Sequence, residues 1–472
     1  MIISTSRFTT KNIALVLVLI VPYKITFGQD SADISFVESF IANFNRKNFS
    51  SIYNSTSNEF QKKVSRENFL QIFSSVYEQA GTITTFQFSD KPSNLHTIYL
   101  LYCEKLTLVL TLSLDREQEG IAKGLLLRPY RPNTLQFQSP ANKISRLLHS
   151  WQNDSLNQGI VIGIIRNGKS EVQYLGYSDL KRKQKIHSET VFEIGSISKP
   201  ISGIILQSLI IEGQLSIEDR VNKFLPDTIQ LPTINGEEIL LKHLVTHSSC
   251  LPRLPSNFGL GLTNLSNPYQ SYTVENLYHY INNATLSCEI GKHIEYSNLG
   301  AGLLGLILIR ASGKSYNQLV NKYISTPLNA LSIGILNQSN NWATGHDFNG
   351  NIQIPWEFTD AFIGAGGIDA TPSALEKFLL ILIKPDSSKL GLAIKQSKET
   401  LLKSVQEIGT FWYKQRLNEK QIIWHNGQTG GFNSFIGWID GSQSGVFVLS
   451  NNSTNIATEL GMSYLEELAL SD

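Results

Sequence analysis

Hydrophobic residues recur every three or four positions over two stretches near the start of the chain, at 36–44 and 59–80. This spacing is typical of amphipathic helices. Four short runs rich in β-branched, aromatic and apolar residues follow, and they predict strands at 82–88, 96–103, 106–114 and 121–127. Helices followed by a series of antiparallel strands indicate a small α+β domain, which we place at 29–130.

The pattern changes after a segment with several prolines, which predicts a linker at 131–143. A helix is expected at 144–151, a strand at 159–165, a hairpin turn at Asn167-Gly168 and a returning strand at 171–177. Further helices are expected at 201–211, 272–283, 299–311 and 373–383. The stretch 422–438 predicts a turn and then a strand, and 446–450 an edge-paired strand. Residues 144–472 therefore form a second, larger domain.

The N-terminus has the features of an export signal. Arg7 and Lys11 precede an apolar run at 13–21, which is shorter than the ~20 residues that span a bilayer. Thr26 and Gly28 then place small residues at the two positions that matter for cleavage. We therefore predict a signal peptide at 1–28 and a periplasmic or secreted protein; an uncleaved anchor is the alternative.

The cysteines are Cys103, Cys250 and Cys288. In an oxidising compartment one pair could form a disulfide and the third would remain free. Cys250 and Cys288 belong to the same later domain and are the candidate pair. The cysteines have no nearby histidine spacing that would indicate a zinc site.

The amino-acid composition and net charge limit which classes of binding partner are expected. The chain has 41% hydrophobic and 17% charged residues and a net charge of +1, which is typical of globular proteins and gives no reason to expect nucleic acid or an anionic surface. We expect a small molecule or a peptide as substrate and no stable membrane insertion after signal cleavage. The sequence leaves the oligomeric state open.

Ser196 lies five positions before the start of an apolar run at 201–211 that is long enough for a helix. It is expected at the helix N-terminus, with Lys199 one turn further on the same face. The helix dipole favours negative charge beside Ser196, while burial and the dipole both lower the pKa of Lys199. A neutral Lys199 amine could then accept the serine proton. Taken alone, Ser-x-x-Lys also fits a capping serine and a solvated lysine, so this interpretation needs partners elsewhere.

Two later segments supply such partners: Tyr296-Ser297-Asn298 and His425-Asn426-Gly427. Together with Ser196-Ile-Ser-Lys199 and in this order, they resemble the serine penicillin-recognising superfamily, which includes class C β-lactamases, D-alanyl-D-alanine carboxypeptidases, D-aminopeptidases and related esterases. The resemblance covers 144–472. It implies an α+β (α/β sandwich) fold, in which an antiparallel sheet is flanked by helices and joined by a helical lobe. The smaller domain resembles, in its order of elements alone, the cone-shaped nuclear-transport-factor-two-like domains.

The resemblance also implies the catalytic roles. Ser196 attacks a carbonyl carbon. Lys199 is its base, or shares that task with Tyr296, whose pKa nearby cations would have to lower. Tyr296 then protonates the leaving group and later activates water. A second Tyr-x-Asn, at Tyr280, lies inside a predicted helix, so we prefer Tyr296.

Four further residues are implied in substrate binding. Asn298 holds the substrate amide and positions Lys199. Gly427 lets substrate approach the strand edge, and the N–H groups of Ser196 and Gln428 form the oxyanion hole. His425 stands where many relatives have lysine. Because histidine carries much less charge at pH 7, this favours a D-amino-acid peptide, amide or ester over potent antibiotic degradation.

The sequence thus predicts a metal-free, cofactor-free serine hydrolase that acts on an amide or ester through an acyl-enzyme on Ser196. Candidate substrates are a D-amino-acid peptide, a β-lactam or a small ester. One alternative is a penicillin- or peptidoglycan-binding sensor that does not hydrolyse its ligand. A lipase-like esterase is a narrower alternative.

Overall fold

The computed structural model describes residues 31–471, except 94–95, 116–119, 130–139, 155–157, 260–263, 265, 287, 337–340, 405 and 418. The predicted signal peptide and most of the predicted linker therefore lie outside the described residues. The chain divides into two compact units, Met1–Asn133 and Thr134–Asp472. Each has a hydrophobic core of its own. In the described part of the chain, no helix combines the length and hydrophobicity needed to cross a bilayer.

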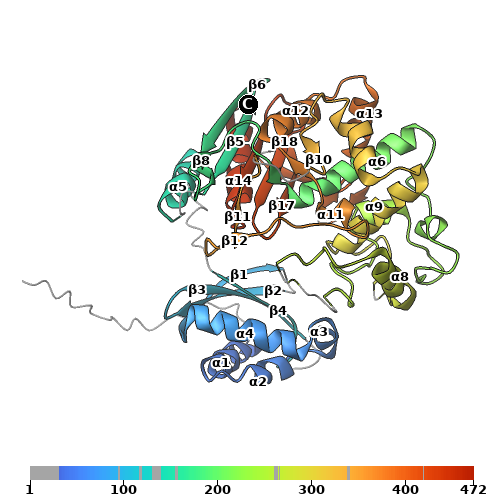
Figure 1. The fold of residues 1–472 in the computed structure, drawn as a ribbon. Helices are drawn as coiled ribbons and strands as arrows, with labels where there is room; N and C mark the ends of the chain where they lie inside the picture. Colours follow the sequence, from blue (N-terminus) through green and yellow to red (C-terminus); the bar gives the residue numbers. More distant parts are fainter. Residues whose placement is uncertain are drawn as a thin grey trace, which may run out of the picture. The chain divides into compact units, whose positions relative to one another are not determined.

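The first unit consists of four helices and one antiparallel sheet (Figure 1). Phenylalanines of the helices, such as Phe40, Phe44 and Phe73, pack in its core. The predicted helix at 59–80 is in fact two helices, because the Ser65 hydroxyl accepts the Asn68 N–H and starts a new helix there. The elements are α1 (Ser31–Asn45), α2 (Phe49–Asn54), α3 (Asn58–Lys63), α4 (Arg66–Ala80), β1 (Ile83–Ser93), β2 (His96–Cys103), β3 (Thr107–Leu114) and β4 (Ala122–Pro129).

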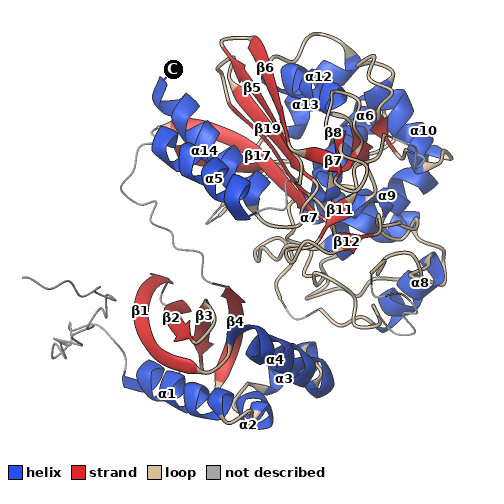
Figure 2. Ribbon diagram, turned by 60° about the vertical axis from the view of Figure 1, so that its left-hand side comes forward, coloured by secondary structure: helices blue, strands red, loops and turns tan. Residues whose placement is uncertain are grey.

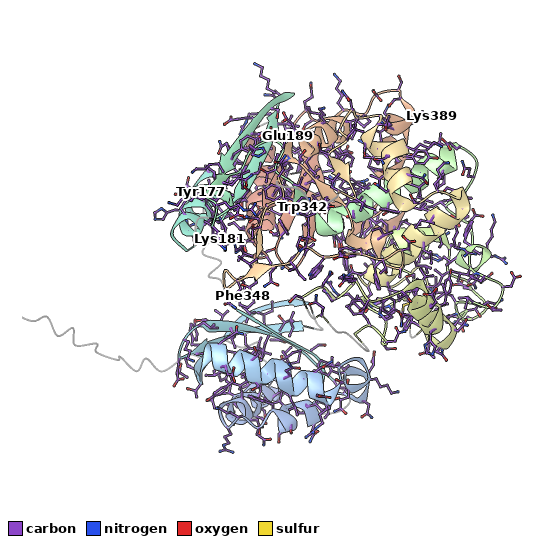
Figure 3. All side chains as sticks on the ribbon, in the orientation of Figure 1. Tyr177, Lys181, Glu189, Trp342, Phe348 and Lys389 are labelled. Carbon is purple, nitrogen blue, oxygen red and sulfur yellow. A yellow bond between two sulfur atoms is a disulfide. The ribbon has the colours of Figure 1, made fainter. Side chains whose placement is uncertain are left out.

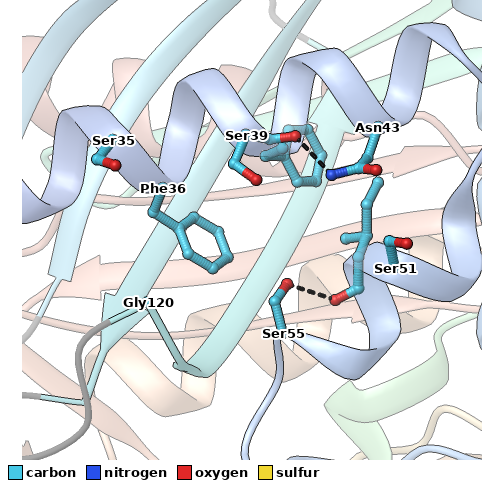
Figure 4. A pocket seen from close by; sticks show the side chains of 9 residues that line it. Ser35, Phe36, Ser39, Asn43, Ser51, Ser55 and Gly120 are labelled. Atoms are coloured by element: carbon cyan, nitrogen blue, oxygen red, sulfur yellow. Dashed lines mark hydrogen bonds between the residues drawn. The ribbon is translucent and has the colours of Figure 1, made fainter.

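A hollow of about 200 Å³ lies beside α1 and α2 (Figure 4). Two polar side chains on its wall are already engaged, since Asn43 donates to the Ser39 carbonyl and Ser55 to the Ile52 carbonyl. These bonds stabilise the local backbone. The candidate catalytic residues all belong to the other unit.

The second unit is built on an eight-stranded antiparallel sheet in the order β14-β15-β16-β17-β18-β19-β5-β6. Asn167 and Gly168 both have positive φ and form the predicted hairpin turn between β5 and β6. The strands are β5 (Ile160–Arg166), β6 (Lys169–Leu175), β14 (Leu402–Lys403), β15 (Glu407–Ile408), β16 (Tyr413–Leu417), β17 (Lys420–Gln428), β18 (Asn433–Ile439) and β19 (Gly445–Ser450).

Helices cover both faces of this sheet, as the predicted α+β fold requires (Figure 2). Side chains alternate along each strand: Ile160 and Ile162 pack with α5 (Pro140–Asp154) and α14 (Ile456–Ser471), whereas Val161 and Ile165 belong to the larger core on the other face. That larger core also contains α6 (Ser198–Ile211), α12 (Pro372–Ile383) and α13 (Lys389–Ser397).

The predicted helical lobe surrounds α9 (Asn298–Ser312) and includes α7 (Leu241–Val245), α8 (Val274–Asn283), α10 (Tyr316–Val320) and α11 (Ile363–Gly366). Short strands complete the unit. They are β7 (Tyr177–Asp179), β8 (Gln184–Lys185), β9 (Phe192–Glu193), β10 (Ile333–Gly334), β11 (Gly345–His346), β12 (Ile352–Gln353) and β13 (Asp369–Ala370). Tyr177, at the start of β7, is labelled in Figure 3.

Two predictions about the last strands of the second unit, β17 and β19, were wrong. His425 and Gly427 lie inside β17 rather than in a turn, because this strand pairs along its length with β18, from Ile422 opposite Ile439 to Gln428 opposite Asn433. β19 is not an edge strand either. It pairs with β18 on one side and β5 on the other.

Candidate active site

Ser196 lies in a short 3-10 turn, Gly195–Ile197, that connects β9 to α6. Gly195 has a φ of +50°, and a Cβ atom there would lie 2.8 Å from the backbone nitrogen of Gln428. Only glycine therefore lets this turn pack against the end of β17. The Ser434 hydroxyl fixes the same junction from β18, since it donates to the Ile194 carbonyl at 2.8 Å. Ser196 itself is partly exposed.

Lys199 is fully buried one turn after Ser196. Its Nζ lies 2.9 Å from Ser196 Oγ and donates a 2.7 Å hydrogen bond to the Ala365 carbonyl. Burial, and then the positive charge of Arg253, lower the pKa of Lys199 well below 10.5. Ser196 and Lys199 thus lie in hydrogen-bonding contact, and burial favours the neutral form of the amine.

The Ala365 carbonyl reaches Lys199 because α11 packs tightly on α9. A Cβ atom on Gly302 would lie 2.3 Å from the Ala361 carbonyl oxygen, and one on Gly305 would lie 2.8 Å from the Gly364 nitrogen. Gly305 thus allows the backbones of α9 and α11 to touch, and Gly302 brings α9 against the residues just before α11. Sequence reasoning did not point to Ala365. The family resemblance implied instead that Asn298 positions Lys199.

Tyr296 lies beside this pair, half-buried just before α9. Lys199 Nζ is 4.9 Å from the centre of the Tyr296 ring. Burial raises the pKa of Tyr296, and this effect outweighs the nearby Ser196 hydroxyl and the charge of Arg253, which both lower the pKa. The shift is opposite to the lowering that a tyrosinate base would need, so Tyr296 keeps its proton.

His247 supports Tyr296 from the loop after α7. The two rings are 4.6 Å apart, and His247 Nδ1 accepts the Ser297 N–H at 3.1 Å. Burial lowers the pKa of His247 well below 6.5, with smaller contributions from Lys199, His425 and Arg253. A neutral imidazole thus fixes the backbone beside Tyr296.

Asn298 is the first residue of α9 and is buried. Its Nδ2 donates to the Tyr269 hydroxyl at 3.1 Å, while its Oδ1 is buried and has no partner among the described residues. A buried acceptor without a partner costs free energy, so this oxygen suits a donor brought by a ligand. The sequence pointed to Asn298 but not to Tyr269, whose position in a loop gave no signal.

His425 is fully buried in β17. Its Nδ1 is 2.6 Å from the Asn426 carbonyl oxygen, and the Tyr413 ring stacks on it at 5.3 Å. Burial, and then the charge of Lys199, lower the pKa of His425 to about 3. The imidazole is therefore neutral at pH 7 and supplies no full positive charge.

Gly427 and Gln428 form the edge where β17 meets the Ser196 turn. A Cβ atom on Gly427 would lie 2.0 Å from the Ile194 carbonyl oxygen, so a side chain there would push the segments apart. The Gln428 side chain bonds to the Ser453 carbonyl at 2.7 Å, and its backbone faces Gly195. The three predicted motifs thus converge in one place.

The site also borders a disulfide. Cys250 and Cys288 are joined with their Cα atoms 5.6 Å apart, and Cys103 is free. Cys250 has a φ of +61°, which a non-glycine residue rarely adopts. It lies in the loop between His247 and Arg253.

The chain is also similar in sequence to known proteins. The chain is 25% identical over 318 residues to Protein flp of Staphylococcus aureus (strain N315), a match covering 64% of this chain and 61% of that protein. It is 25% identical over 287 residues to the D-alanyl-D-alanine-carboxypeptidase/endopeptidase AmpH of Escherichia coli (strain K12), covering 56% of this chain and 72% of the relative. The chain therefore spans about 61% of the length of the first relative.

A solved structure of a class C β-lactamase mutant superposes with a TM-score of 0.60 at 18% identity, covering 71% of this chain and 97% of that structure. At this identity the likeness shows the fold alone. The Beta-lactamase family matches residues 152–471, which include Ser196, Lys199, Tyr296 and His425. Because this match covers more than half of the sequence, the chain belongs to the Beta-lactamase family.

Proposed function

We propose that this protein is a serine hydrolase that cleaves an amide or ester through an acyl-enzyme on Ser196. The observation that carries the proposal is the 2.9 Å contact between Ser196 Oγ and the buried Lys199 amine. A lysine without exposed surface is costly to keep charged, and its neutral form is a base in hydrogen-bonding reach of a hydroxyl.

The proposed reaction begins when Lys199 takes the Ser196 proton and the serine oxygen attacks the substrate carbonyl. The backbone N–H groups of Ser196 and Gln428 stabilise the resulting oxyanion. Tyr296, whose raised pKa keeps it protonated, gives its proton to the leaving nitrogen or oxygen and is reprotonated by Lys199. Water then attacks the acyl-enzyme ester and releases Ser196. The raised pKa favours Tyr296 as proton donor and Lys199 as the base for acylation.

For the substrate we propose a D-amino-acid peptide, a small ester or a β-lactam. Asn298, with its unpartnered Oδ1, is suited to accept a hydrogen bond from the substrate amide. The names of the relatives, a D-alanyl-D-alanine-carboxypeptidase/endopeptidase and a class C β-lactamase mutant, support this choice of compounds. The neutral His425 argues against strong charge recognition at its own position.

We also propose that the protein is exported. The basic residues and apolar run before Gly28 support a signal peptide. The bond between Cys250 and Cys288 supports the same proposal, because disulfides persist mainly in oxidising compartments.

The test is turnover of D-amino-acid amides, nitrocefin and p-nitrophenyl esters by the wild type and two variants. Ser196→Ala should lower turnover by more than about 10³-fold, since the nucleophile is lost. Tyr296→Phe should lower it by about 10²–10⁴-fold through loss of the proton donor. Tyr280→Phe is the matched control, because Tyr280 belongs to a second Tyr-x-Asn segment on α8, and it should keep wild-type rates. Wild-type turnover in Ser196→Ala would refute the proposal, and a burst without steady turnover would indicate the non-hydrolysing sensor.

A further inference from the structure

The groups around Ser196 are arranged so that positive charge is suppressed. Burial lowers the pKa of Lys199, His247 and His425. The side chains that act electrostatically on these three groups within the described residues are all basic, and none is an aspartate or glutamate. An anionic substrate would therefore find no full charge on the buried residues of the site.

Arg253 is the exception. Its guanidinium carbon lies 5.2 Å from the centre of the Tyr296 ring, and its side chain is exposed. Among the described residues no carboxylate forms a salt bridge with it. Its positive charge also lowers the pKa values of Lys199, His247 and Tyr296.

The backbone of Arg253 is hydrogen-bonded to the helix that follows Tyr296. Its carbonyl accepts the N–H groups of Asn298 and Leu299 at 3.0 and 3.2 Å, at the start of α9. The loop that bears it begins beside the Cys250–Cys288 disulfide. The guanidinium is thus a permanent cation on a fixed support, with its donors open to solvent.

We propose that Arg253 binds a carboxylate of the substrate. This inference rests on the proposed function and specifies its substrate class. The ring under the guanidinium belongs to Tyr296, the proposed proton donor to the leaving group, so the carboxylate belongs on the leaving-group side of the scissile bond. The preferred substrates are therefore amides whose released part carries a free carboxylate. Arginine suits this role because its planar fork pairs with carboxylates in a bidentate geometry.

The test compares N-acetyl-D-alanyl-D-alanine with its C-terminal amide, which differ only in the carboxylate charge. In Arg253→Gln the acid-to-amide ratio of kcat/KM should fall about tenfold or more. Arg253→Lys keeps the charge and should hold this ratio within about threefold of the wild type. Arg416→Gln removes an exposed arginine from β16 and should leave the ratio unchanged. An equal loss for both compounds would show that Arg253 acts only through the pKa values of Lys199 and Tyr296, and would overturn the proposal.

Binding separates this proposal from the proposed function. Calorimetry on Ser196→Ala, which cannot form the acyl-enzyme, should show tighter binding of the acid than of the amide, and adding Arg253→Gln should abolish the difference. Equal or absent binding of the two compounds would refute the role of Arg253 whether or not the wild type hydrolyses them. Failure of the wild type to turn over the acid, the amide, nitrocefin and p-nitrophenyl esters alike would instead count against the serine hydrolase itself.

Discussion

Burial decides the protonation states of individual residues at this site. Lys199 and His425 have no exposed surface, and Tyr296 is half-buried, so the neutral form of each is favoured. A neutral lysine accepts a proton, whereas a neutral tyrosine donates one. In the proposed reaction, the same physical effect therefore gives Lys199 and Tyr296 opposite roles.

These roles predict the pH dependence of acylation. Because the neutral Lys199 amine is the active form and its pKa is lowered well below 10.5, the rate of acylation should rise with pH and reach its plateau well below pH 10.5. Stopped-flow acylation of a p-nitrophenyl ester measures this, and Lys199→Met should lose the rate by about 10²–10⁴-fold. A rate that still climbed above pH 10 would instead identify the Tyr296 phenolate as the base, since the Tyr296 pKa is raised.

A second buried group, Glu193, lies three residues before Ser196. Its carboxylate accepts the Trp356 N–H at 2.6 Å and the Thr429 hydroxyl at 2.8 Å, and its cross-strand neighbour is Asp369. Burial raises the pKa of Glu193 to about 7, and burial together with the charge of Glu193 raises the pKa of Asp369 well above 3.8. The folded protein thus holds protons that the unfolded chain releases.

The free energy of unfolding should therefore fall as the pH rises from about 4.5 to about 7. Glu193 should account for roughly 2–3 kcal/mol of this decrease. Glu193→Gln cannot ionise and should have a flatter profile, which urea denaturation at pH 5 and pH 8 would reveal. Glu171→Gln, at an exposed glutamate of β6, is the control. A variant with the same slope as the wild type would show that Glu193 is already ionised at pH 5.

At the scale of elements, close approaches between backbones set the geometry. The Ser196 turn touches β17 at Gly195 and Gly427. Helix α9 touches α11 and the residues just before it at Gly305 and Gly302. The sequence predicted most of these helices and strands from their hydrophobic spacing. It placed His425 and Gly427 in a turn because glycine and asparagine are common there, whereas pairing with β18 keeps them in a strand.

The disulfide connects two loops that both reach Tyr296. Replacing Cys288 by serine should lower the free energy of unfolding by roughly 2–4 kcal/mol, as expected for opening a loop with a sequence separation of 38. It should also lower kcat, because the loop between α7 and Tyr269 carries His247 and Arg253. Thermal unfolding with and without dithiothreitol measures the effect.

Cys103→Ser is the matched control, because Cys103 is free and belongs to the first unit. Its melting temperature should drop in dithiothreitol as much as that of the wild type, whereas Cys288→Ser should not respond. A wild type that is insensitive to the reductant would contradict this prediction.

At the scale of the whole molecule, the site depends on segments that are far apart in the sequence. Ser196, Tyr296 and His425 belong to three such segments, and the order of their motifs was enough to predict that they meet. No role was predicted for Arg253, Tyr269 or Ala365, because their roles come from distances in space. Arg253 and Tyr269 also lie in loops, which leave no periodic signal in the sequence. Side-chain contacts between distant loops become visible only once the chain is folded.

The most direct test of the account is where acyl transfer occurs. Wild-type protein mixed with p-nitrophenyl acetate or benzylpenicillin, quenched with acid and examined by intact-mass spectrometry and peptide mapping, should carry one acyl group on Ser196. The adduct should be absent from Ser196→Ala and form far more slowly in Lys199→Met. An adduct of equal yield in Ser196→Ala, or one mapped to another residue, would contradict the central claim.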